Sequence, residues 1–237
     1  MGTDIHDYVE VRQADGTWRA TTADERTRPC VEGITIIPQS GIYGDRNYDV
    51  FGILADVRNE TRSKHLVPGG PYRQKAPYVP ISKPRGFPTD VSTEVVEAAD
   101  WWSCEAYSHS HLTLREVMEF DWTQEVTMHG WVTPADFLRH RLGVSPQYKW
   151  EDVSARRRVK VSLEKMADIV GAEAYWSDIQ RLEPTGGLFD WKDRYYTKLE
   201  WQVKYFEVAV YFLGQSLPQL WRLGAPDDVR LVFWFDN

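Results

Sequence analysis

Cysteine is scarce in this chain, and its two cysteines are too few for a disulfide framework. A chain without such a framework is expected in a reducing compartment. The sequence also lacks any apolar run approaching the roughly 20 residues that a membrane-spanning helix needs. Its N-terminus has no basic segment followed by an apolar one, as a signal peptide would. We therefore expect a cytosolic protein that does not associate with a membrane.

Positive charge is in deficit as well. The chain carries 28 lysines and arginines against 35 aspartates and glutamates, and its formal net charge is −7. Neutralising the phosphates of a nucleic acid requires clustered basic side chains. The balance therefore argues against binding of extended nucleic acid and leaves small molecules and proteins as partners.

Aromatic residues, in contrast, are abundant: 11 tryptophans, 12 tyrosines and 9 phenylalanines in 237 residues. They contribute large buried areas to a core or flat faces to a pocket for a planar ligand. No stretch has the biased composition of a linker, so we expect a single domain over residues 1–237. Its class should be α+β, with a mixed or antiparallel sheet, several packed helices and a long loop.

Two pairs of polar residues with a spacing of two are the main indication of a site. Asp4 and His6 form one pair, and His109 and His111 form the other. In an extended segment, residues i and i+2 point the same way, so each pair can reach one target. Imidazole and carboxylate groups bind Zn, Mn or Fe. These four residues are our candidate ligands of a divalent metal, and His109 and His111 are also candidate catalytic residues.

Other interpretations of the second pair are available. Thr113 and Glu116 fit a capping box at a helix start, and the histidines can be polar residues in the turn before it. The sequence His111-Leu-Thr113 also matches the His-x-Thr signature of two-histidine phosphodiesterases. That fold needs a second copy, and no other histidine here is followed two residues later by Ser or Thr. We therefore assign Thr113 to capping.

Residues near two glycine-containing segments are the candidate substrate contacts. Arg46, Asn47 and Tyr48 precede a helix expected over 48–58, although a turn and a cap would explain them equally well. Arg85 lies in the Pro- and Gly-rich segment 59–90, which we interpret as a loop over the site. An arginine can hold an anionic substrate with two hydrogen bonds. Asp90, which follows this segment, is the third candidate catalytic residue.

Periodicity predicts the main elements. Residues 4–12 and 228–235 are apolar strand patterns at opposite ends of the chain, and we expect them in one sheet, where each satisfies the backbone of the other. Apolar residues at steps of four and three predict one long helix over 196–213. Phe206 and Val210 should then be buried at the middle of its apolar stripe.

Several blocks of the sequence are distinctive: MGTDIH (1–6), DRNYDVF (45–51), LADVRN (54–59), PRGFPTDVS (84–92) and HSHLTL (109–114). Together they resemble an uncharacterised protein family of bacteriophage and prophage genomes. The resemblance covers most of residues 1–125 and the Phe-Trp-Phe-Asp ending at 233–236. It implies a phage protein that acts in the host cytoplasm, and it implies no activity.

Three functions are compatible with these patterns. The first is a metal-dependent hydrolase or phosphodiesterase acting on a nucleotide or another phosphate-containing small molecule, with a metal-bound hydroxide as nucleophile. The second is a non-catalytic counter-defence protein that binds a nucleotide signal or a host defence protein through arginines and loop aromatics. The third is a structural or regulatory phage component whose histidines lie in a core.

Overall fold

The structure is a computed structural model, and the chain divides into two compact units. Unit 1 comprises Met1–Asn59, Tyr78–Gln124 and Tyr205–Asn237, and unit 2 comprises Glu60–Pro77 and Glu125–Lys204. The expectation of a single domain stays a prediction. Within the described part of the chain, no helix has the length and apolarity to cross a membrane. The structure describes residues 2–21, 30–31, 34–35, 42–59, 72–74, 76–102, 105–146, 159–171, 175–182 and 195–236.

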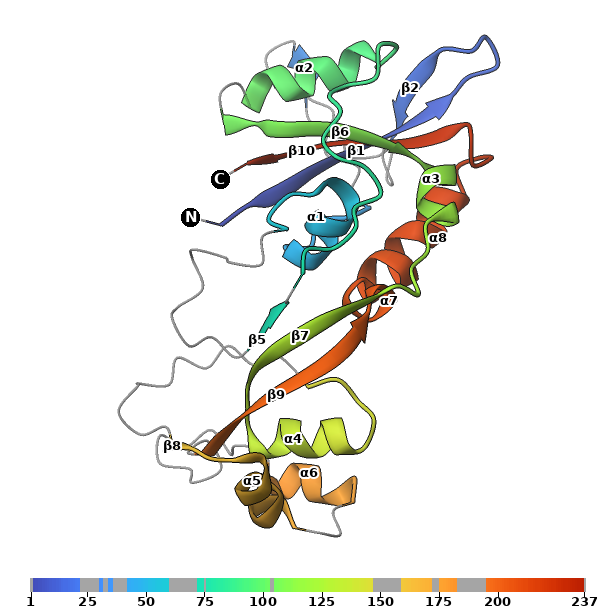
Figure 1. Ribbon diagram of the computed structural model, residues 1–237. Coiled ribbons are helices and arrows are strands. Elements are labelled where there is room, and N and C mark those ends of the chain that lie inside the picture. Colours follow the sequence, from blue (N-terminus) through green and yellow to red (C-terminus); the bar gives the residue numbers. More distant parts are fainter. Residues whose placement is uncertain are drawn as a thin grey trace. The chain divides into compact units, whose positions relative to one another are not determined.

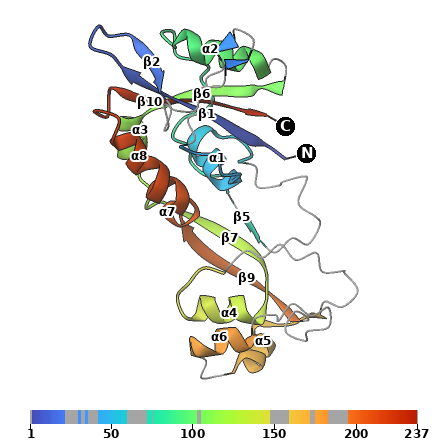
Figure 2. The same cartoon turned by 180° about the vertical axis from the view of Figure 1, so that it is seen from behind.

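Unit 1 is built on an antiparallel sheet with the strand order β2-β1-β10-β6 (Figure 1). Helix α2 covers one face of this sheet, and α1 lies on the other face (Figures 1 and 2). The strands of unit 1 are β1 (Asp4–Arg12), β2 (Trp18–Thr21), β3 (Cys30–Val31), β4 (Ile34–Thr35), β6 (Tyr107–Thr113) and β10 (Val229–Asp236). Its helices are α1 (Tyr48–Ala55), α2 (Thr93–Trp102), α3 (Leu114–Glu119), α7 (Tyr205–Val208), the π-helical turn η4 (Phe212–Ser216) and α8 (Leu217–Trp221).

The two ends of the chain form the centre of this sheet, and the α+β class is confirmed. β1 and β10 pair antiparallel from Asp4 opposite Asp236 to Val11 opposite Val229. Alternation places Ile5 and Val9 on the face that α1 covers, where they join the main core. His6 and Tyr8 lie on the other face, the α2 face. The expectation that residues 4–12 and 228–235 lie in one sheet is therefore confirmed, and the two strands are direct neighbours.

Local capping explains where the helices of unit 1 begin. Asn47 accepts hydrogen bonds from the backbone amides of Asp49 and Val50 at the start of α1. Thr113 and Glu116 form the predicted capping box of α3. α1 ends at Ala55, three residues before the expected end, because the next residue leaves the helical conformation.

Unit 2 contains a second sheet with the order β5-β7-β9-β8. Its long antiparallel pair joins β7 and β9, and β8 adds parallel to β9. Helix α4 packs against α5, α6 and β9. The elements of unit 2 are β5 (Tyr72–Gln74), β7 (Glu125–Val132), α4 (Pro134–Arg141), β8 (Val159–Lys160), α5 (Leu163–Val170), α6 (Ser177–Leu182) and β9 (Tyr195–Lys204).

The long helix expected over 196–213 is wrong. Its first half is the strand β9, in which Leu199, Trp201 and Val203 are buried at a spacing of two. Leu199 and Val203 satisfy the helical and the strand period alike, which is why the pattern indicated a helix. Phe206 is 41% exposed and Val210 is 64% exposed, so the predicted burial of both is also wrong.

Candidate functional site

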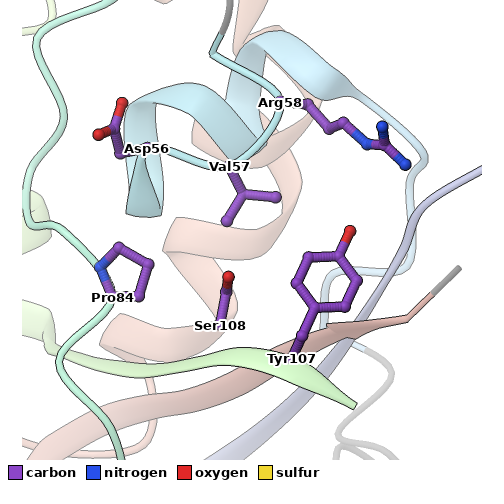
Figure 3. Close-up of a pocket in the computed structure, with 6 residues that line it drawn as sticks. All are labelled: Asp56, Val57, Arg58, Pro84, Tyr107 and Ser108. Carbon is purple, nitrogen blue, oxygen red and sulfur yellow. The ribbon is translucent and has the colours of Figure 1, made fainter. Parts of the chain in front are cut away.

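A surface pocket of about 310 Å³ lies in unit 1 between the end of α1 and the start of β6. Its volume is within the range of small-molecule sites, at the lower end. The hydroxyls of Tyr107 and Ser108 point from β6 toward the segment that follows α1 (Figure 3). The residues that line the pocket are Asp56, Val57, Arg58, Pro84, Tyr107 and Ser108.

Left-handed backbone conformation is concentrated in this pocket. Across the described residues, three side-chain-bearing residues have a positive φ: Asp56 at 59°, Arg58 at 55° and Ser108 at 53°. All three line the pocket. The left-handed conformation costs a residue with a Cβ roughly 1–2 kcal/mol. Such costs tend to collect where a side chain must be aimed at a ligand.

The end of α1 explains the first of these conformations. The amide of Asp56 donates to the carbonyl of Gly52 at 3.0 Å, and the amide of Val57 donates to that of Phe51 at 3.3 Å. This closing pattern requires a left-handed residue after the helix, a position that glycine or asparagine usually occupies. Here the residue is an aspartate, and its carboxylate lies at the negative end of the helix dipole. Asp56 is therefore unfavourable both in conformation and in charge.

A β-bulge explains the conformation of Ser108. Phe233 of β10 lies opposite Ser110, whereas Phe235 lies opposite Tyr107, so two steps on β10 match three on β6. The left-handed Ser108 falls within this irregular stretch, as the first residue of a glycine-type bulge would. Bulges reorient side chains, and this one places the Ser108 hydroxyl in the pocket beside Tyr107.

Hydrogen bonds hold the basic side of the pocket. Arg58 donates its Nε–H to Oγ1 of Thr3 at 2.6 Å. The same Thr3 oxygen lies 3.0 Å from Oη of Tyr107. The Thr3 amide in turn donates to Oη of Tyr48 at 3.0 Å. This network joins the start of β1 to both walls of the pocket and places a guanidinium and a phenol hydroxyl at one end of it.

The predicted histidines share the α2 face of the sheet but lie apart on it. His6 and His109 flank Trp234, with ring centroids 6.0 and 5.9 Å from the indole. His6 also lies 3.9 Å from the ring of Trp102, and its Nε2 lies 3.2 Å from Oδ2 of Asp236. The rings of His109 and Phe87 pack in an edge-to-face arrangement, with their centroids 4.6 Å apart. Burial lowers the pKa of His109, so at neutral pH its imidazole is uncharged.

The other predicted catalytic residues contact the protein itself. Nδ1 of His111 lies 3.0 Å from the carbonyl oxygen of Gly86, and burial lowers the pKa of this histidine. Asp90 accepts hydrogen bonds from Arg230 at 2.6 Å and from Trp18 at 2.9 Å. The hydrogen bond from Arg230 lowers the pKa of Asp90. A role of these residues in catalysis stays a prediction.

The predicted substrate contacts also have structural partners. Arg46 forms a two-pronged ion pair with Asp4, which lowers the pKa of that carboxyl. Arg85 forms a similar pair with Glu116 at 2.7 and 2.8 Å. Asn47, besides capping α1, donates to the carbonyl of Val208 at 2.8 Å. Tyr48 is the acceptor for Thr3 described above. None of the four lines the pocket.

The predicted metal ligands Asp4, His6, His109 and His111 therefore divide between an ion pair, an aromatic cluster and a backbone contact. Among the residues that the structure describes, no group of three or more His, Cys, Asp or Glu side chains is arranged to hold a metal ion. Metal binding by these residues stays a prediction.

The residues that line the pocket were not singled out from the sequence. Asp56 and Arg58 fall inside the helix expected over 48–58, so the pattern carries no signal of the left-handed position at which α1 ends. Pro84 falls in segment 59–90, the expected loop over the site. No protein-family model, no curated protein and no solved structure matches the chain.

Proposed function

We propose that this chain is a phage-encoded protein of the host cytoplasm that binds a phosphate-containing small molecule of the nucleotide class. In this proposal it acts against host defence by capturing a nucleotide signal without converting it. One observation carries the proposal: the three left-handed, side-chain-bearing residues of the described chain all line one pocket. The phage-family resemblance supports the biological setting.

The chemistry of the pocket supports an anionic ligand. Arg58 supplies a permanent positive charge, and its planar guanidinium matches a phosphate group. Tyr107 and Ser108 supply two hydroxyls on the same wall, which can donate to phosphate oxygens. Val57 and Pro84 add apolar surface against which a sugar or a base can pack.

Binding is better supported than hydrolysis by the described geometry. The side chains that we predicted as catalytic are held by other groups of the protein, Asp90 by Arg230 and His111 by the Gly86 carbonyl. Metal-dependent hydrolysis is therefore the competing proposal, and it predicts turnover.

The test is a binding screen with a matched pair of arginine variants. Wild-type protein, Arg58→Met and Arg115→Met are titrated by calorimetry with nucleoside mono-, di- and triphosphates, cyclic nucleotides and inorganic phosphate. Arg115 is an exposed arginine of α3 that does not line the pocket, so its variant is the control. We expect a nucleotide to bind wild type and the control equally and to bind Arg58→Met at least about tenfold more weakly. Chromatography of the ligand after incubation, with and without Zn, Mn or Fe, measures turnover.

Two outcomes overturn the proposal. If no phosphate-containing compound binds the wild type, the pocket is not a phosphate site. If a bound nucleotide is converted in a metal-dependent way, the protein is the hydrolase of the competing proposal.

A further inference from the structure

The two ends of the pocket differ in charge, and this difference bears on which ligand it takes. Arg58 and Asp56 lie on either side of Val57 in the close-up view (Figure 3). The Arg58 end carries the guanidinium and the Tyr107 phenol. The Asp56 end carries a carboxylate, which accepts hydrogen bonds and donates none. A ligand that uses both ends needs an anion at one and hydrogen-bond donors at the other.

The Asp56 carboxylate has acceptor capacity left for a ligand. Its Oδ1 accepts a hydrogen bond from Nδ2 of Asn59 at 2.7 Å. Among the described residues, Oδ2 has no hydrogen-bond partner. Asn59 is buried, and it also bonds both the amide and the carbonyl of Tyr78, at 2.7 and 2.8 Å. The carboxylate is therefore held by Asn59 on one oxygen, and the other oxygen can accept from a ligand.

The protein bears a cost to keep a carboxylate at this position. Glycine would end α1 at lower conformational cost, and neither glycine nor asparagine would place a negative charge at the negative end of the helix. Asp56 has both the left-handed conformation and the unfavourable charge. Departures from local sequence rules tend to mark residues whose side chains have a function. A ligand that donates hydrogen bonds to Asp56 gives this carboxylate such a function.

We propose that the pocket selects a ribonucleoside monophosphate, with its phosphate at Arg58, Tyr107 and Ser108 and its ribose diol at Asp56. This inference rests on the proposed function. An acidic side chain recognises the ribose 2′-hydroxyl, a hydrogen-bond donor, in dinucleotide-binding sites. The ribose lies next to the phosphate in such a ligand, so one small pocket contacts both groups. Val57 and Pro84 contact the apolar edge of the sugar.

The experiment separates the two ends by ligand and by variant. Calorimetry compares a ribonucleoside monophosphate with its deoxy and dideoxy analogues and with ribose phosphate and inorganic phosphate. The proteins are wild type, Asp56→Asn and Arg58→Met. Asparagine tolerates the left-handed conformation and keeps an oxygen for Asn59, so Asp56→Asn changes the charge and not the backbone. Thermal unfolding of each variant verifies that it is folded.

We expect wild type to bind the ribonucleotide at least about tenfold more tightly than the dideoxy analogue. In Asp56→Asn this preference should fall to about threefold or less, while binding of the dideoxy analogue is unchanged. Arg58→Met should weaken the binding of all the phosphate compounds. The ratio of the affinities for the ribonucleotide and the dideoxy analogue should stay unchanged. If wild type binds ribonucleotide and dideoxynucleotide equally, or if Asp56→Asn keeps the preference, the assignment of Asp56 is overturned and the proposed function survives. If no phosphate compound binds, the proposed function itself fails.

Discussion

Arg230 donates its Nε–H to Glu10 at 2.6 Å, and both side chains are almost completely buried, at 5% and 0% exposure. The same guanidinium donates to Asp90 and lies over the ring of Trp18, 3.9 Å from its centroid. The other Glu10 oxygen accepts from the amide of Ser92 at 2.6 Å. One buried ion pair thus joins β1, β10 and the segment that leads into α2.

Removing the cation from this pair should destabilise unit 1 strongly. Arg230→Ala leaves the Glu10 carboxylate buried without its partner, which costs about 3–5 kcal/mol. Denaturant unfolding measures the change. Arg115→Ala is the matched control, because its pair with Asp227 is exposed to solvent and should contribute little to stability. A loss for Arg230→Ala as small as that for the control would show that the network does not hold the sheet to this segment.

Relieving the strain at Ser108 should stabilise the protein. Ser108→Gly removes the Cβ that disfavours a φ of 53°. We expect the free energy of unfolding to increase by up to about 1 kcal/mol. The increase is smaller than the relieved strain, because glycine also raises the conformational entropy of the unfolded chain. Ser108→Ala keeps the Cβ and should give no gain, although it removes the same hydroxyl from the pocket. Equal stability of the two variants would contradict the assigned strain.

The Arg85–Glu116 pair should make stability depend on pH in the acid range. The two hydrogen bonds from Arg85 lower the pKa of Glu116 from 4.5 to about 2. A carboxyl with a lowered pKa in the folded state contributes its full stability above the pKa of the unfolded state. That contribution is lost as the pH falls from about 4.5 to 2. The difference in unfolding free energy between wild type and Glu116→Gln should therefore decrease as the pH falls across this interval. When both proteins also carry Arg85→Met, this difference should depend less on pH. A constant difference between pH 2 and 6 would argue against the pair.

Local signals in the sequence predicted much of the fold. The hydroxyl cap at Thr113 acts within three residues, so the sequence alone reveals it. The pairing of β1 with β10 followed from two apolar strand patterns that each needed a partner. The pocket could not be predicted in the same way. The conformation of Ser108 depends on its register with β10, and the chemistry of Asp56 depends on where α1 ends.

The histidines show the opposite case, in which a short motif was visible and its surroundings were not. His6 and His109 were expected to meet, and the sheet does place both on one face. Trp234 of the intervening strand β10 lies between them, because side chains alternate along β10 and this alternation directs the indole to that face. Sequence spacing within one strand carries no information about the residue that a neighbouring strand inserts.

The misassigned helix over 196–213 leads to a direct comparison of two apolar residues. Trp201 is 6% exposed in the strand β9, and Val210 is 64% exposed. Trp201→Ala should cost about 3–5 kcal/mol, because it leaves a cavity beneath the sheet of unit 2. Val210→Ala should change the free energy of unfolding by no more than about 0.5 kcal/mol, because little contact is lost. Denaturant unfolding of both variants, followed by tryptophan-independent far-ultraviolet circular dichroism, makes the measurement. Similar losses at both positions would contradict the burial of Trp201 in β9 and the exposure of Val210.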